Sequence, residues 1–198
     1  GEGDGAAYAS WTPTPDVVTT RELAAVELAC RDELHRPNTS IDADRAALRL
    51  SERRGQLVVL LYRTEDPDLS AACVVRNPAG SSNAQLVDLA IGGSSGPALS
   101  APARGFTQGT VSQFEELSMT DGAVGEQVTG VTIHAGTFTV TASVANGRYV
   151  AWWPGPAFEA RPDRPGAAEG DASALILTYD LTLDDGTVIR DADPTRPS

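Results

Sequence analysis

The stretch from residue 137 to residue 153 constrains the fold more than any other part of the chain. Apolar side chains alternate strictly with threonine and serine over 137–144, a period of two that is typical of a strand with one buried face. Asn146-Gly147 then favours a tight turn, and an apolar run from Tyr149 to Trp153 follows. The segment therefore predicts a β-hairpin within an antiparallel sheet.

Shorter patterns predict the other strands. The run Leu57–Tyr62 is continuously apolar, which indicates a central strand buried on both faces. Alternation returns over 175–183, before a turn at Asp185-Gly186 and a last strand at Val188-Ile189. Further strands are expected near residues 48–50, 71–75, 86–91 and 131–133. No rhythm of strand, helix and parallel strand is present, so we expect antiparallel pairing throughout.

One segment, from about Thr19 to His35, has the pattern of a helix. Thr19 and Glu22 fit a capping box, and Pro37 ends the pattern. An apolar stripe recurs at helical spacing, at Leu23, Val26, Cys30 and Leu34. The predicted fold class is α+β: a strongly curved antiparallel sheet of about 8–10 strands with one N-terminal helix packed on it.

The ends and the middle of the chain define its organisation. Residues 1–16 are expected to form an extended tether, because alternating prolines follow Trp11, which could pin the tether to the body. Residues 17–198 are expected to form a single domain. The segment 92–105 is rich in Gly, Ser, Pro and Ala, and we interpret it as a surface loop; the alternative is a boundary between two subdomains.

The two cysteines give information on the cellular compartment of the protein. Cys30 lies on the predicted helix and Cys73 on a predicted strand, with no CxxC spacing that would indicate a metal site. We favour a disulfide, which would close a loop of 43 residues (73 minus 30). In the chain-entropy model such a bond contributes about 4 kcal/mol. Two buried free thiols, or a catalytic thiol with a basic partner, are the alternatives. A disulfide would place the domain in an oxidising, extracytoplasmic compartment.

The charge balance narrows the class of partner. The formal net charge is −12, the pI is about 4.5, and all 15 basic residues are arginine. Without a concentrated basic surface, the composition argues against nucleic acid and against electrostatic binding to anionic lipid. No apolar run reaches the ~18 residues that span a bilayer. Because the chain starts at Gly1 without methionine, we expect a signal peptide or membrane anchor to have been removed upstream.

The sharpest motif is the G-x-S-x-G pentapeptide at residues 92–96, which resembles the nucleophile turn of α/β-hydrolases. Pro97 and Pro102 oppose the helix that should follow it. A triad of Ser94 with His134 and Asp121 would need a fold that the sequence does not indicate. We interpret the motif as a flexible loop, with a serine nucleophile as the alternative.

The histidines and paired carboxylates give weaker signals. We expect His35 at the helix end and His134 on a strand surface, and neither as a metal ligand. The carboxylate pairs are Asp42 with Asp44, Asp66 with Asp68, Glu115 with Glu116, and Asp184 with Asp185. They fall in predicted turns, so we interpret them as solvated acidic surface, with general acid–base work as the alternative. No cofactor and no metal site is expected.

The largest aromatic cluster is Tyr149, Trp152 and Trp153. Adjacent strand residues point to opposite faces, so the two tryptophans cannot enter the same core layer. One is expected in the core, and the other could cover the sheet or line a ligand groove. These three residues are the best candidate for a ligand surface.

Several segments in order resemble the extracytoplasmic domains of uncharacterised actinobacterial single-pass membrane or secreted proteins. They are residues 10–15 (SWTPTP), the cysteine-bearing helix, residues 51–55 (SERRG) before an apolar strand and a cysteine-bearing strand, and residues 147–155 (GRYVAWWPG). The resemblance implies an upstream membrane segment and an external domain, and it implies no activity.

The leading hypothesis is a non-enzymatic extracytoplasmic domain that binds a protein or cell-envelope ligand as part of a sensor or regulator. The alternative is a secreted hydrolase that uses Ser94 or paired carboxylates. The sequence does not indicate an oligomeric state.

Overall fold

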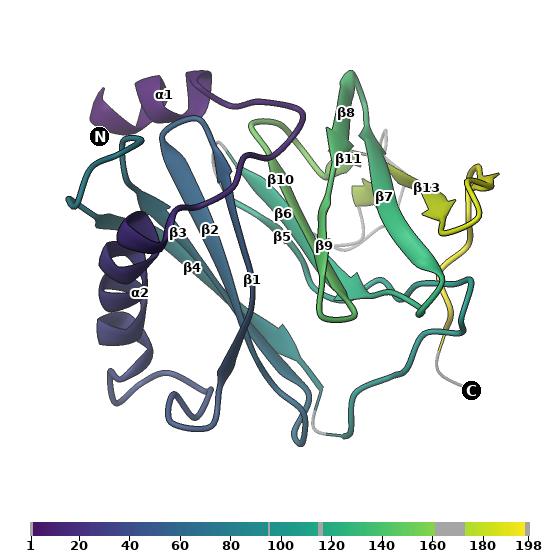
Figure 1. Cartoon of the computed structure of the whole chain (residues 1–198), viewed down its shortest axis with the longest axis horizontal. Coiled ribbons are helices and arrows are strands. Elements are labelled where there is room, and N and C mark those ends of the chain that lie inside the picture. Colours follow the sequence, from purple (N-terminus) through teal and green to yellow (C-terminus); the bar gives the residue numbers. More distant parts are fainter. Residues whose placement is uncertain (1, 95, 115–116, 161–172, 197–198) are drawn as a thin grey trace, which may run out of the picture.

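The computed structural model describes residues 2–94, 96–114, 117–160 and 173–196 (Figure 1). Within these ranges every strand pairing is antiparallel. The strands form three four-stranded sheets and one two-stranded ribbon. The fold is therefore mainly β, and the predicted single curved sheet is replaced by several separate sheets.

The first sheet contains β1 (Ala47–Arg54), β2 (Leu57–Thr64), β3 (Leu69–Arg76) and β4 (Gln85–Gly93), in that order. Strand β2 is buried along its whole length, which confirms the interpretation of its apolar run. Its side chains alternate between two cores. Val58, Leu60 and Tyr62 face a core shared with α2 (Thr20–Leu34), whereas Leu57, Val59 and Leu61 face the core that the first sheet shares with the second.

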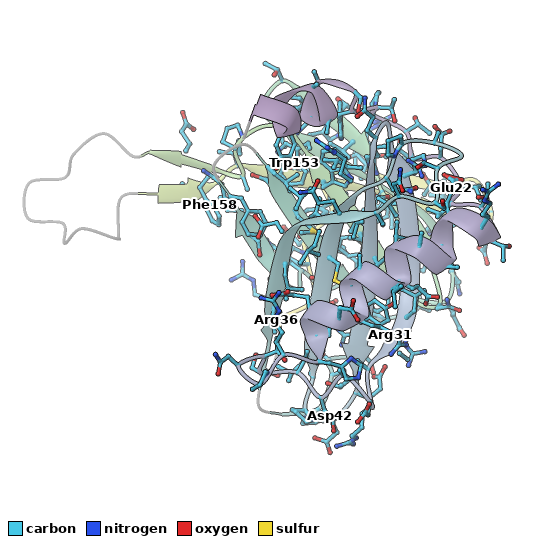
Figure 2. The ribbon with its side chains drawn as sticks, turned by 90° about the vertical axis from the view of Figure 1, so that its left-hand side faces the viewer. Glu22, Arg31, Arg36, Asp42, Trp153 and Phe158 are labelled. Atoms are coloured by element: carbon cyan, nitrogen blue, oxygen red, sulfur yellow. A yellow bond between two sulfur atoms is a disulfide. The ribbon has the colours of Figure 1, made fainter. Side chains whose placement is uncertain are left out.

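Helix α2 covers the outer face of the first sheet, with Glu22 at its N-terminal end and Arg31 near its C-terminal end (Figure 2). The predicted capping box forms, because Thr19 and Glu22 exchange side-chain and backbone hydrogen bonds. His35 is the C-cap, as expected. Cys30 forms a disulfide with Cys73 on β3, with the two Cα atoms 5.8 Å apart. The predicted helix and the predicted bridge are both confirmed.

Two further sheets complete the layers. The second sheet has the order β5 (Val111–Gln113), β6 (Ser118–Ala123), β10 (Arg148–Trp153), β9 (Ser143–Ala145). The third sheet has the order β14 (Val188–Ile189), β13 (Leu177–Leu183), β7 (Val128–Ala135), β8 (Phe138–Thr141). The ribbon pairs β11 (Phe158–Ala160) with β12 (Ser173–Leu175). From left to right, Figure 1 shows α2, the first sheet, the second sheet and the third sheet.

One predicted strand passes from one sheet to another, and this explains why the predicted single sheet is divided. The alternating stretch 137–144 divides at Ala142, so β8 pairs with β7 in the third sheet while β9 pairs with β10 in the second. At the division, the Ala142 N–H donates to the Val131 carbonyl and the Thr141 N–H to the Pro13 carbonyl. Strands that pass between packed sheets in this way are a known device of layered β-folds.

The first residues differ from the extended tether that the prolines predicted. Glu2–Ala9 form a second helix, α1, and Ala7 is fully buried beside the core between the first and second sheets. The prolines constrain only residues 12–15, whereas the preceding alanines are good helix formers. Trp11 does anchor the segment: its indole Nε1–H donates to the Trp152 carbonyl at 2.8 Å. Neither described helix has the length and apolar character needed to cross a bilayer.

Candidate functional site

The predicted aromatic ligand surface lies inside the protein. Tyr149, Trp152 and Trp153 on β10 are each 0% exposed. The two tryptophans point to opposite faces, as alternation requires, with Trp152 between the first and second sheets and Trp153 between the second and third. The prediction of a ligand surface is wrong because both faces of β10 are covered, which a strand pattern alone cannot reveal.

The serine of the G-x-S-x-G motif follows β4 in an irregular segment. Its backbone N–H donates to the Asp68 carbonyl at 2.8 Å, and residues 96–105 contain no helix. His134 lies on β7, where its Nε2 is 2.8 Å from Asp180 Oδ2 on β13. Among the described residues, no hydrogen bond joins the Ser94 side chain to a histidine or a carboxylate. The predicted histidine placements hold, and no nucleophile–base pair forms at Ser94.

Two of the predicted paired carboxylates serve turns, whereas Asp68 pairs with Arg63. Asp42 Oδ1 accepts from the Asp44 N–H at 3.0 Å, and Asp185 Oδ1 accepts from the Thr187 N–H at 2.9 Å. Glu115 and Glu116 lie outside the described residues. Within the described ranges, no group of three or more His, Cys, Asp or Glu side chains is arranged to hold a metal ion.

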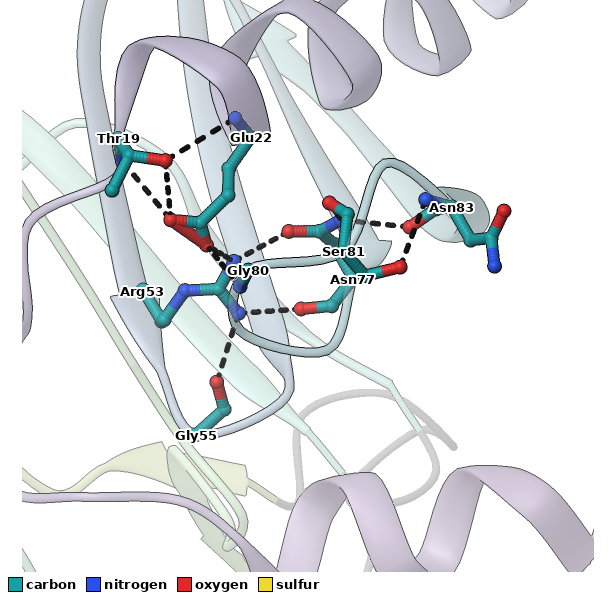
Figure 3. A network of polar contacts seen from close by, with 8 residues as sticks. All are labelled: Thr19, Glu22, Arg53, Gly55, Asn77, Gly80, Ser81 and Asn83. Carbon is teal, nitrogen blue, oxygen red and sulfur yellow. Dashed lines mark hydrogen bonds and ion pairs between the residues drawn. The ribbon is translucent and has the colours of Figure 1, made fainter.

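A buried arginine joins α2 to the first sheet (Figure 3). Arg53 donates to Glu22 on α2 and, at 2.5 Å, to the side chain and to the backbone carbonyl of Asn77. Glu22 also accepts from the Thr19 hydroxyl at 2.6 Å and from the Gly80 N–H at 3.4 Å. The Thr19 hydroxyl is the main cause that lowers the pKa of Glu22 to about 2. We call these five residues the closed site, because they connect three segments and line none of the described cavities.

The neighbouring arginine serves the opposite face of β1. Arg54 donates from Nε to Glu52 at 2.9 Å, and both side chains are fully buried. It also donates to the backbone carbonyls of Thr12, Pro13 and Thr141. Glu52 in turn accepts from the Ser143 hydroxyl on β9. These contacts join β1 to the N-terminal segment, to the third sheet at Thr141 and to the second sheet at Ser143, so this pair has a structural role.

Two further arginines line an open cavity of about 440 Å³. Arg63 comes from β2 in the first sheet and Arg148 from β10 in the second, and Asp68 lines the cavity with them. The rest of the wall is made by Ser70, Gly92, Gly93, Ser94, Leu99, Thr107, Gln108, Gly109 and Thr110. We call it the arginine cavity. Its volume is in the range of small-molecule sites.

Strand register places the charged groups. Arg63 is directly opposite Ser70 in the β2–β3 pairing, so their side chains share one face. In the β6–β10 pairing Asp121 is opposite Val150, which makes Asp121 and Arg148 diagonal neighbours on one face. That face of each sheet turns toward the other sheet. The packing of the two sheets therefore brings the four side chains together.

A chain of hydrogen bonds connects the two arginines. Arg63 donates to the Ser70 hydroxyl at 2.5 Å, and that hydroxyl donates to Asp121 Oδ2 at 2.8 Å. Arg148 donates to the same carboxylate oxygen at 3.3 Å. Arg63 also pairs with Asp68. The chain fixes the position of both guanidinium groups relative to the cavity.

The glycines of the motif have a packing role at this cavity. A side chain at Gly93, whose φ is +142°, would meet the Asp68 carbonyl oxygen at 1.9 Å. A Cβ at Gly92 would meet the Thr110 hydroxyl at 2.3 Å, and one at Gly109 would meet the Asp121 carbonyl oxygen at 2.7 Å. These glycines allow β4 and the segment before β5 to approach the charged groups closely.

The electrostatic environment of Arg148 is unfavourable for its own charge. Burial lowers the pKa of Arg148, and repulsion from Arg63 lowers it further, against the attraction of Asp121. Among the described residues, the buried Nε–H groups of Arg63 and Arg148 have no acceptor. Buried donors without partners are uncommon in native proteins, so the hydrogen bonding of this site is incomplete.

Sequence reasoning missed Arg63 and Arg148 and placed Asp121 only in a speculative triad. Arg63 directly follows the apolar run of β2, and Arg148 directly precedes that of β10. Each arginine stands in its strand at a position whose side chain points to the same face as buried apolar residues. A single charged residue at such a position is the signal that could have marked them. The partners of these residues depend on sheet packing, which one sequence does not give.

Comparisons of the chain with protein-family models, with curated proteins and with solved structures each found no significant match.

Proposed function

We propose that this chain is a non-enzymatic extracytoplasmic binding domain whose ligand occupies the arginine cavity. The observation that carries the proposal is the cavity itself: the guanidinium groups of buried Arg63 and of Arg148, which is 12% exposed, come from different sheets and line one opening of about 440 Å³. A small-molecule-sized cavity with charged side chains in its wall favours a small molecule of the cell envelope over the flat surface of a partner protein. Such a ligand would suit a sensor or regulator.

The disulfide supports the extracytoplasmic part of the proposal. Cys30 and Cys73 are both 0% exposed and joined, and no free cysteine accompanies them. Disulfides persist in oxidising compartments and are rare in the cytosol. The bond joins α2 to β3, so it belongs to the folded core and does not act as a labile surface thiol pair.

Ser94 and Asp68, from one of the predicted carboxylate pairs, line the same cavity, and this supports the alternative of a secreted hydrolase. Serine hydrolysis needs a base within hydrogen-bond reach of the hydroxyl. The groups fixed near the cavity are arginines, already paired carboxylates and the Ser70 hydroxyl, and arginine does not act as a base at neutral pH. Binding is the function that these groups support best.

The experiment is an NMR titration of ¹⁵N-labelled protein with soluble fragments from an enzymatic digest of peptidoglycan. The backbone amides of Gly92, Gly93 and Gly109 should shift saturably, whereas those of Gly80 and Gly186, which line no described cavity, should not. Leu99→Trp adds bulk where Leu99 lines the cavity. Leu28→Trp, at a 66% exposed position on α2, is the matched control.

The proposal predicts that Leu99→Trp abolishes the glycine shifts and that Leu28→Trp leaves them unchanged. Shifts that are equal in both variants, or that spread over the whole spectrum without saturation, would overturn it. If Ser94→Ala slows the appearance of new cleavage products in the same mixture, the hydrolase alternative would replace it.

A further inference from the structure

We propose that the arginine cavity binds a monocarboxylate, whose oxygens accept hydrogen bonds from the guanidinium groups of Arg148 and Arg63. The inference rests on the proposed function for its premise that the cavity is a ligand site. It adds the chemical class of the ligand.

The charges that line the cavity favour an anion. Two guanidinium groups and one carboxylate, that of Asp68, face it, which leaves one positive charge in excess. Asp121 is set back: it lines only a space of about 10 Å³ next to the cavity. Its Oδ1 accepts from the Thr110 N–H at 3.1 Å, and its Oδ2 accepts from Ser70 and Arg148. A ligand in the cavity therefore meets the arginines and not this carboxylate.

The arginines are held in place by groups of the protein itself. The side chains of Arg63 and Arg148 are only 4% and 12% exposed. Ser70 and Asp121 already fix their positions, so an incoming ligand does not have to order two long side chains. A guanidinium carries five N–H donors in a planar fork. In the described part of the chain, side-chain hydrogen bonds of Arg148 use one of them, at Nη2.

The charge balance favours a monoanion over a dianion. The lining carries one excess positive charge, and Asp121, which pairs with Arg148 from outside the cavity, offsets part of it, so a second negative charge would be uncompensated. The whole chain carries a formal net charge of −12, which opposes the approach of a second negative charge. The planar fork of arginine also matches the two oxygens of a carboxylate.

The environment of Arg148 is consistent with this ligand. Burial and the neighbouring Arg63 lower the pKa of Arg148. A carboxylate placed between the two guanidinium groups would offset their repulsion.

The test uses sodium acetate as the probe and acetamide as its neutral isostere, at constant ionic strength and pH 7. The readout is the ¹H–¹⁵N signal of the arginine Nε–H groups. Acetate should shift the signals of Arg148 and Arg63 saturably with a dissociation constant in the millimolar range, acetamide should not, and inorganic phosphate should bind more weakly. Arg53 is the internal control, because its Nε–H is also buried without an acceptor but it lines no described cavity.

Two variants should change the affinity in opposite directions. Arg148→Lys keeps the charge beside Asp121 but removes the planar fork, so acetate should bind about tenfold more weakly. Asp68→Asn removes the negative charge from the lining and keeps a carbonyl oxygen for Arg63, so acetate should bind about threefold to tenfold more tightly. Unchanged affinity in both variants would overturn the proposal, and so would equal shifts with acetamide.

The outcomes separate this inference from the proposed function. If peptidoglycan fragments shift the cavity glycines while acetate leaves the Arg148 and Arg63 signals unmoved, the binding function stands and the monocarboxylate is wrong. If acetate binds as predicted but Leu99→Trp has no effect on fragment binding, the anion site stands and the proposed function fails.

Discussion

Arg53 and Arg63 are both on the first sheet, and both are buried, ion-paired and left with an Nε–H that has no acceptor. Arg53 faces α2, and Glu22 and Asn77 enclose it in the closed site (Figure 3). Arg63 faces the second sheet, where the wall remains open as the arginine cavity. Where a helix covers a buried, ion-paired arginine, the arginine connects structural elements. Where two sheets leave a space beside such an arginine, it presents hydrogen-bond donors to a ligand.

The largest expected effect comes from breaking the closed site. Arg53→Met should lower the free energy of unfolding by about 3–5 kcal/mol, because it leaves the buried Glu22 carboxylate without its cation. Urea denaturation monitored by circular dichroism measures the change. The double variant Glu22→Leu/Arg53→Met is the control and should recover most of the loss, since both charges are then absent. A loss below about 1 kcal/mol in Arg53→Met would show that this site is not structural.

The features of the closed site that lie within one helix were predictable from the sequence. The contacts between that helix and the sheet were not. The capping box of Thr19 and Glu22 follows from a spacing of three residues, and the placement of Cys30 on the apolar stripe follows from helical periodicity. The contact of Glu22 with Arg53 joins residues 31 positions apart and depends on how α2 crosses the sheet. No periodic pattern encodes that crossing.

The arginine cavity was less predictable because its walls come from segments without an apolar pattern. Strand β6 has the sequence Ser-Met-Thr-Asp-Gly-Ala, yet every residue of it is buried. Ser118 and Asp121 are tolerated there because groups from neighbouring segments accept or donate their hydrogen bonds. One of Trp152 and Trp153 was expected in the core, but the burial of both was missed for a related reason: a strand pattern says which face is apolar, not how many layers cover it.

The second expected effect concerns the covalent bond beside the closed site. Reduction, or the variant Cys30→Ala/Cys73→Ala, should lower the free energy of unfolding by about 4 kcal/mol. The measurement is thermal unfolding with and without a reductant, together with thiol counting on unreduced, denatured protein. The double cysteine variant is the control, because a reductant should not alter its stability. Two readily alkylated thiols in the native protein would remove the support for an extracytoplasmic location.

The third expected effect is a loss of stability at low pH that depends on Glu22 in the closed site. Glu22 has a pKa of about 2 in the folded protein against an ordinary value of 4.5. Its contribution to stability is therefore present above pH 4.5 and is lost as the pH falls from there to about 2. Urea midpoints measured across this window should fall less steeply in Glu22→Gln than in the wild type. Parallel profiles would show that Glu22 does not control this transition.

The smallest effect on stability is expected at the arginine cavity. Arg148→Lys keeps a cation beside Asp121 and loses the planar fork, so the free energy of unfolding should fall by less than about 1 kcal/mol. The same variant should bind acetate about tenfold more weakly, which separates a binding residue from a structural one. Urea denaturation and the arginine Nε–H titration measure the two quantities on one sample. If the loss of stability approached that of Arg53→Met while the acetate affinity stayed constant, Arg148 would be another closed ion pair, and the contrast between the two arginine sites would fail.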